Sequence, residues 1–174
     1  MSKKTPTPEQ MQKIESQIKE TYYKAWADMI EKELNEDKFD YVCKLHSEIV
    51  VRICNTIPNR GDIHDIIAEN MDPVLFKQQL ENKAFTGPDF LNLVQYVYTW
   101  IKRLCSRARD KGIEDSLNEI MKNVNEGKTM GQLVPIFLIK VHGHLDDLDQ
   151  DLGRETSVNF KEFAKTYLKN KSTT

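Results

Sequence analysis

The segment Phe90–Asp110, FLNLVQYVYTWIKRLCSRARD, decides the fold that this sequence predicts. Its apolar residues recur mostly every three or four positions, so they occupy about 120° of a helical wheel. A capping hydroxyl at Thr86, Pro88 in the first turn and the early acid Asp89 mark the start of a helix. We therefore expect an amphipathic helix that ends near Ala108. Its predicted core positions are Phe90, Leu93, Val94, Val97, Ile101, Leu104, Cys105 and Ala108.

One shoulder of this apolar face carries aromatic and basic side chains. Tyr96, Trp100, Arg103 and Arg107 follow each other at spacings of four, three and four residues, which aligns them along one side of a helix. The aromatic rings could close the edge of the core while the arginines extend over them towards water. Alternatively, the shoulder presents an aromatic and basic surface to a partner, and Arg109 just beyond it belongs to the same candidate surface.

The end of the same segment holds a dense basic cluster. Its members are Lys102, Arg103, Arg107, Arg109 and Lys111. Among them stands a single acid, Asp110. Such a cluster could bind phosphate, a nucleic-acid backbone or an acidic helix. Basic residues at a helix C-terminus are also favoured simply by the helix dipole, so the cluster has a structural explanation as well.

The rest of the chain shows the same helical periodicity. Apolar stripes predict helices over residues 7–34, 38–57, 62–71, 73–85, 110–125, 129–152 and 157–168. Thr7, Asp62, Asp72 and Asp110 are candidate N-caps for four of them. Few segments alternate as strands do, so we expect an all-α fold, a single-domain bundle of about seven to eight helices. Residues 7–169 form the expected domain, between a disordered start (1–6) and a disordered tail (170–174).

Composition favours a soluble protein without a general attraction to polyanions. The formal charge is −2, so nucleic-acid or membrane binding would need a local patch. No apolar run approaches the ~20 residues of a membrane span, and the start MSKKTPTPEQ lacks the apolar core of a secretory signal. The cysteines Cys43, Cys54 and Cys105 show no disulfide pattern, and we interpret them as core residues in a reducing, cytoplasmic setting.

The acidic segment 144–151 invites a metal hypothesis. Asp147, Asp149 and Asp151 match three positions of a calcium loop, but Leu152 and Val158 stand where glycine and glutamate are needed. Pairs of histidine and aspartate around His142 point to different sides of a helix, which favours a solvated acidic face. His46 with Cys43 likewise gives only two ligands. We expect no metal, no cofactor and, without a nucleophile elbow or phosphate loop, no enzyme.

Three blocks of the sequence occur in the order typical of one family. Leu45, Glu48, Ile49 and Pro58 form the first; Ile67, Glu69, Asp72, Gln78 and Gln79 the second; Leu104, Cys105, Arg109 and Asp110 the third. Over about residues 39–152 the chain resembles the T-complex protein 11 family, as a short, divergent or truncated member. Ser106-Arg107-Ala108 replaces the proline that usually follows the family's Leu-Cys pair.

This resemblance implies an all-helical, non-enzymatic protein linked to cyclic-AMP and protein kinase A signalling. We therefore expect a protein-interaction module whose partner is another protein. A nucleic-acid- or phosphate-binding module at the basic end of the 90–110 helix is the alternative. The residues that we select as candidates for partner binding are Tyr96, Trp100, Arg103, Arg107 and Arg109.

Overall fold

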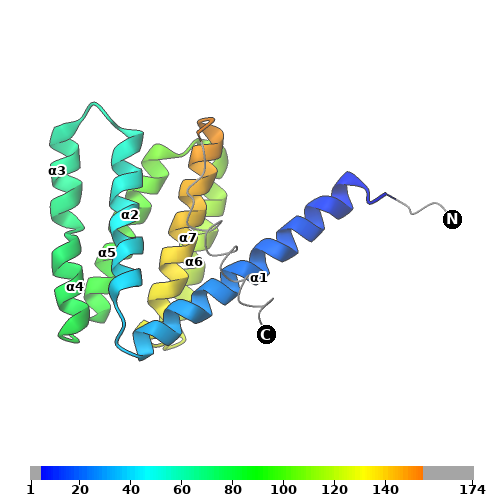
Figure 1. Ribbon diagram of the computed structural model, residues 1–174. Helices are drawn as coiled ribbons and strands as arrows, with labels where there is room; N and C mark the ends of the chain where they lie inside the picture. The colour runs from blue at the N-terminus through cyan, green and yellow to red at the C-terminus, as the bar shows by residue number, and fades with distance from the viewer. Residues whose placement is uncertain (1–4, 155–174) are drawn as a thin grey trace.

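Seven α-helices and one short 3-10 helix make up residues 5–154, the part of the chain that the computed structural model describes (Figure 1). They are α1 (Pro8–Asn35), α2 (Asp40–Thr56), α3 (Gly61–Asn70), α4 (Pro73–Glu81), α5 (Gly87–Leu104), η1 (Arg107–Arg109), α6 (Asp110–Asn125) and α7 (Met130–Asp151). The predicted all-α bundle is confirmed. The helix expected at 157–168 and the tail expected at 170–174 lie outside the described residues.

Local signals place several helix ends where the sequence predicts them. The Thr7 hydroxyl accepts a hydrogen bond from the Gln10 amide, and the Gln10 side chain accepts one from the Thr7 amide, which completes a capping box at α1. Asp72 accepts from two amides at the start of α4. Gly127 has a φ of +77°, a conformation that glycine adopts without strain, and it follows the end of α6.

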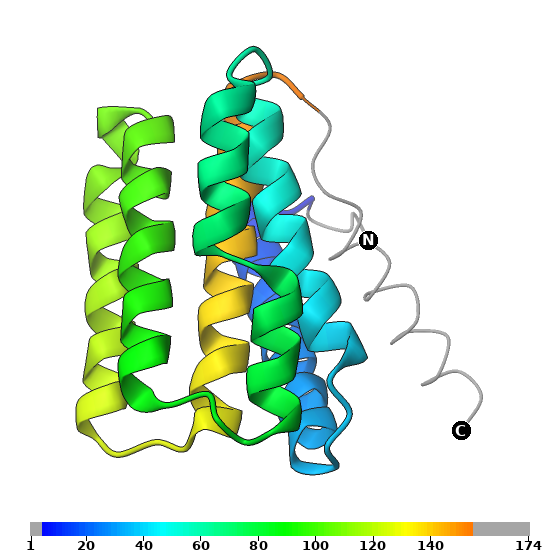
Figure 2. The same cartoon turned by 90° about the vertical axis from the view of Figure 1, so that its left-hand side faces the viewer.

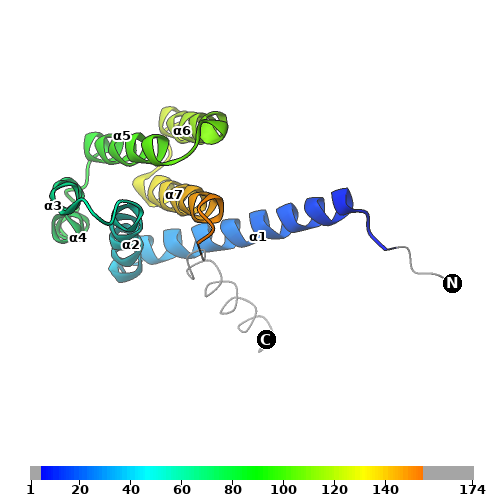
Figure 3. The same ribbon diagram turned by 90° about the horizontal axis from the view of Figure 1, so that it is seen from above.

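The helix at the centre of the bundle is α7 and not α5. Viewed from above, α7 lies between the α5–α6 pair on one side and α1 with α2 on the other (Figure 3). Ten of its residues are buried, including Leu138 and Val141 with no exposed surface. Pro135 lies inside α7 and is itself buried, because the segment 133–141 is enclosed by neighbouring helices. An apolar surface on all sides is what such a central position requires.

Each outer helix buries one stripe against this centre. Trp26 and Ile30 attach the C-terminal half of α1, and the α5 residues Phe90 and Tyr98 pack against Phe137 of α7. The pair α3–α4 runs along the outer side of α2 (Figure 2). None of the described helices is both long enough and apolar enough to cross a membrane.

Three details of the predicted helices are wrong. The helix expected to reach Ala108 stops at Leu104, and Cys105 is already extended, with a ψ of 155°. Ala108 is therefore exposed instead of buried. Asp62 and Asp110 do not cap α3 and α6, because both helices begin at or before these residues and neither has a side-chain cap.

The three cysteines lie at the edge of the core instead of inside it. Cys43, Cys54 and Cys105 are half-buried, pack against the core and are free. Burial raises the pKa of the Cys43 and Cys105 thiols to about 11, so both are protonated at neutral pH. Tyr98, which is not among the predicted core positions, is buried in α5.

Candidate interaction surfaces

The shoulder of α5 is only partly a continuous surface. Trp100 is half-buried, and the Arg103 guanidinium carbon lies 5.4 Å from the centre of its indole ring, a cation–π contact. Arg107 is exposed but belongs to η1, beyond the break at Cys105, so it does not extend the face of α5. Trp100 and Arg103 thus form a small aromatic and basic pair, and Arg107 stands apart from it.

Tyr96 turns away from that pair towards the space between α4 and α5. It lines a cavity of about 280 Å³ together with His46 and Phe76, whose rings stack at 4.2 Å. Within the described residues, neither the Tyr96 hydroxyl nor His46 Nδ1 has a hydrogen-bond partner. His46 is only 1% exposed, more deeply buried than its position at the edge of the predicted stripe indicates.

Arg109 is engaged within the chain by the end of α7. Its Nε and Nη2 donate to the two carboxylate oxygens of Asp151 at 3.0 and 2.8 Å, and Nη1 lies 3.8 Å from Asp147. Arg109 therefore has a structural role as the partner of acids in α7. Lys102, from the same basic cluster, is paired with Glu114 of α6 at 3.3 Å.

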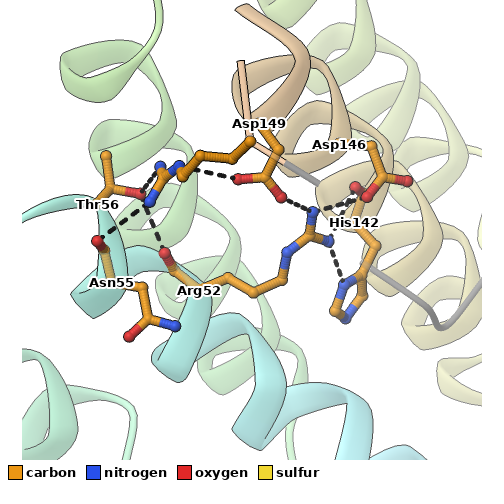
Figure 4. A network of polar contacts seen from close by, with 7 residues as sticks. Arg52, Asn55, Thr56, His142, Asp146 and Asp149 are labelled. Carbon is orange, nitrogen blue, oxygen red and sulfur yellow. Dashed lines mark hydrogen bonds and ion pairs between the residues drawn. The ribbon is translucent and has the colours of Figure 1, made fainter. Parts of the chain in front are cut away.

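The acidic segment of α7 is not the solvated face that the sequence predicted. Arg52 of α2 reaches it through one nitrogen, Nη2, which donates to Asp146 at 2.6 Å and to Asp149 at 2.8 Å (Figure 4). The three side chains are only 12–18% exposed. Arg154 lies 3.7 Å from Asp149 and donates to the Asn55 carbonyl, so two cations face two carboxylates.

His142 connects this network to the core. Its Nδ1 lies 3.1 Å from Arg52 Nη1 and its Nε2 lies 3.0 Å from the Leu45 carbonyl. Arg52 can only donate and the carbonyl can only accept, so the ring is neutral with the proton on Nε2. Burial lowers the pKa of His142 to about 4, which agrees with that form. The network therefore joins α2 to α7.

Among residues 5–154, the N-terminal half of α1 is the clearest surface that packing leaves uncovered. It extends away from the bundle (Figure 1), and all of residues 8–21 are exposed. Three large apolar side chains, Met11, Ile14 and Ile18, are 46–49% exposed on this half. Their spacing of three and then four residues aligns them on one face. We call these three residues the α1 stripe; they lie in the segment 7–34 that apolar periodicity predicts as a helix, and the structure leaves them exposed.

The comparisons with known proteins give one match. The family model described as T-complex protein 11 matches residues 3–152, which extends beyond the region 39–152 where the motifs lie and includes the α1 stripe. No curated protein and no solved structure matches the chain.

Proposed function

Because the chain belongs to the T-complex protein 11 family, we propose that it is a non-enzymatic protein-interaction module, a regulator in signalling of the cyclic-AMP and protein kinase A type. We also propose that it acts in the cytoplasm. The three free cysteines suit that reducing compartment.

The observation that carries the proposal is the exposed α1 stripe. An amphipathic helix that ends in water without covering its apolar face is unfavourable unless another surface covers it. The exposed half, residues 8–21, is ~21 Å long at 1.5 Å per residue. Its other half is fixed to the bundle by Trp26 and Ile30, so the stripe is presented in one orientation. A partner therefore meets a pre-organised helix and does not have to order it.

The spacing of the stripe indicates the kind of partner. Apolar residues at steps of three and four form the seam of a two-helix pairing, where each side chain inserts between residues of the facing helix. The residues beside Ile14 are Lys13 and Glu15, of opposite charge, so the rim selects no strongly charged ligand. We therefore propose an amphipathic helix of another protein as the occupant.

The test compares two pairs of substitutions on the same helix. In Ile14→Asp/Ile18→Asp the stripe is charged, whereas in the control Gln12→Asp/Ser16→Asp the same charge is added at exposed polar positions. Circular dichroism should show both variants folded, because neither pair contributes to the core. A photo-crosslinker at Met11 in the full chain, expressed in its native host, should join one partner, to be identified by mass spectrometry.

The expected result is a crosslinked partner that the control retains and the stripe variant loses. Recombinant partner and chain should then bind in the same pattern, and a helix of the partner should carry the crosslink. A crosslink only to a second copy of the chain, with sedimentation showing a dimer, would replace the proposal by self-association. Equal binding by both variants would refute a role for the stripe.

The alternative of nucleic-acid or phosphate binding has weaker support. Lys102 and Arg109 already hold acids of the chain. Of the described members of the basic cluster, Arg103, Arg107 and Lys111 have no carboxylate partner. Binding to DNA that falls steeply with salt and is lost in Arg103→Glu/Arg107→Glu would favour this alternative over protein binding.

A further inference from the structure

A second feature of the bundle lies where α1 leaves it. There, α1, α6 and α7 line an open cavity of about 540 Å³, which is larger than the one beside Tyr96 and within the range of small-molecule sites. It is lined by the middle of α1, the buried side of α6 and the face of α7 that carries Ile136, Ile139 and Gly143. None of these residues belongs to the α1 stripe, so the cavity is independent of the proposed partner surface.

The charges around this cavity are predominantly positive. Four lysines line it, against the two carboxylates of Glu119 and Asp147. Both carboxylates are already engaged: Glu119 lies 2.8 Å from Lys140, and Asp147 lies 3.8 Å from Arg109. The three remaining lysines are Lys19, Lys24 and Lys128. They form no ion pair with a described carboxylate, although Lys19 lies near enough to Asp146 to oppose the rise in the pKa of that carboxyl.

An imidazole with an unused nitrogen lines the same cavity. Within residues 5–154, the buried Nε2 of His144 has no hydrogen-bond partner. The ring packs edge-on against Tyr98, with ring centres 5.7 Å apart, which holds it in place. Burial lowers the pKa of His144, so the ring is neutral at pH 7 and can offer one N–H donor. Because its Nε2 has almost no accessible surface, His144 lines the cavity through the rest of its ring.

The rest of the wall is apolar. Ala27, Ile136 and Ile139 line it, and the Lys19 ammonium lies 5.5 Å from the centre of the Tyr23 ring. We propose that this cavity binds a small organic anion, with a carboxylate or phosphate held by one or more of the lysines Lys19, Lys24 and Lys128 and an apolar body against α7.

Calorimetry with the full chain and defined probes tests this site. Phenyl phosphate and benzoate share an aromatic body and differ in the oxyanion, whereas benzyl alcohol has the body without the charge. Both anions should bind more tightly than benzyl alcohol, and inorganic phosphate should bind more weakly than phenyl phosphate. Comparing phenyl phosphate with benzoate distinguishes a phosphate site from a carboxylate site.

The variants separate this site from general attraction to a lysine-rich surface. Lys19→Gln/Lys128→Gln should weaken binding of the preferred anion about tenfold or more, because two nearby charges are removed at the cavity. The matched control Lys13→Gln/Lys38→Gln removes the same charge elsewhere and should change nothing. In NMR titrations the pKa of His144 should rise when the anion is bound, since a nearby negative charge favours the imidazolium.

Three outcomes would overturn the inference. In the first, benzyl alcohol binds as tightly as the two anions. In the second, the Lys19/Lys128 and Lys13/Lys38 variants weaken anion binding to the same extent. In the third, neither aromatic anion binds at millimolar concentration. Ile14→Asp/Ile18→Asp should bind the anion normally, so failure of this site and failure of the α1 stripe can be told apart.

Discussion

Replacing Arg52 by methionine should destabilise the bundle strongly. Replacing a charged residue on a helix surface usually has little effect, but Arg52 is not such a residue. Its guanidinium holds Asp146 and Asp149 at 2.6 and 2.8 Å. Methionine keeps most of the apolar volume and removes the charge, so both carboxylates lose this donor. Asp149 keeps Arg154 at 3.7 Å, whereas Asp146 keeps only its electrostatic interaction with Lys19, which forms no ion pair with it.

The size of the effect follows from burial. Removing one partner of a fully buried ion pair costs ~3–5 kcal/mol, and because these side chains keep 12–18% of their surface we expect the lower end, about 3 kcal/mol. Urea unfolding followed by circular dichroism at pH 7 measures it. Arg52→Met/Asp146→Asn should recover most of the loss, because the unpaired charge is gone. Arg60→Met is the matched control, since the Arg60–Asp62 pair is exposed and should show no measurable loss.

The same variant should respond to pH in a defined direction. Burial already raises the pKa of Asp146, and Arg52 opposes that rise. Without Arg52 the folded carboxyl takes up a proton at higher pH than the unfolded one, so folding is favoured as pH falls through the raised folded pKa. The deficit of Arg52→Met relative to wild type should shrink as pH falls from 7. A loss at pH 7 within experimental error, or no recovery in the double variant, would refute this account of the network.

Three further changes have defined outcomes. As the pH falls from 6.5 to about 4, the free energy of unfolding of the wild type should decrease by up to ~1.4 kcal/mol per pH unit for each of His46 and His142. The reason is that these histidines become protonated in the unfolded chain, whereas in the folded protein their pKa is about 4 and they stay neutral. His46→Phe should reduce this pH dependence, as measured by urea unfolding at a series of pH values. Tyr98→Phe should cost about 1–2 kcal/mol by removing the 2.7 Å hydrogen bond to Ser116, and a double-mutant cycle with Ser116→Ala should be non-additive; additivity would contradict the bond. Trp26→Ala should cost about 3–5 kcal/mol in thermal unfolding, and a loss below 1 kcal/mol would mean that α1 is not anchored there.

Much of the fold was predictable because its signals are local. Capping residues such as Thr7 and Asp72, and the periodic stripes between them, depend only on neighbours a few residues away, and they placed seven helices with small errors at the ends. The end of α5 was not predictable in this way. No glycine or proline marks the break at Cys105, and the pattern of apolar residues continues across it.

The sequence also indicates the central position of α7, through the overall apolar character of one segment and not through the spacing of its apolar residues. The segment 133–141, LVPIFLIKV, is apolar on nearly every side, as a helix enclosed by others must be. The environment of the acidic residues after it had no such signal. Asp146 and Asp149 acquire their partner only when Arg52, more than 90 residues earlier, is brought against them. Of the candidate surfaces, the Trp100–Arg103 contact was foreseeable from spacing, whereas the exposure of Met11, Ile14 and Ile18 depends on where the bundle ends.

The place of α7 in the chain also sets an order for biosynthesis. The helix that α1, α2, α5 and α6 all pack against is the last described one to leave the ribosome. Until it emerges, Trp26, Ile49 and Phe90 have no central surface to cover them, so the nascent chain carries its apolar faces uncovered. Closing the core then requires contacts across more than 100 residues between α1 and α7, which slows folding compared with a bundle of sequential hairpins. Nascent chains of this protein should therefore depend on chaperones until residue 151 is outside the exit tunnel.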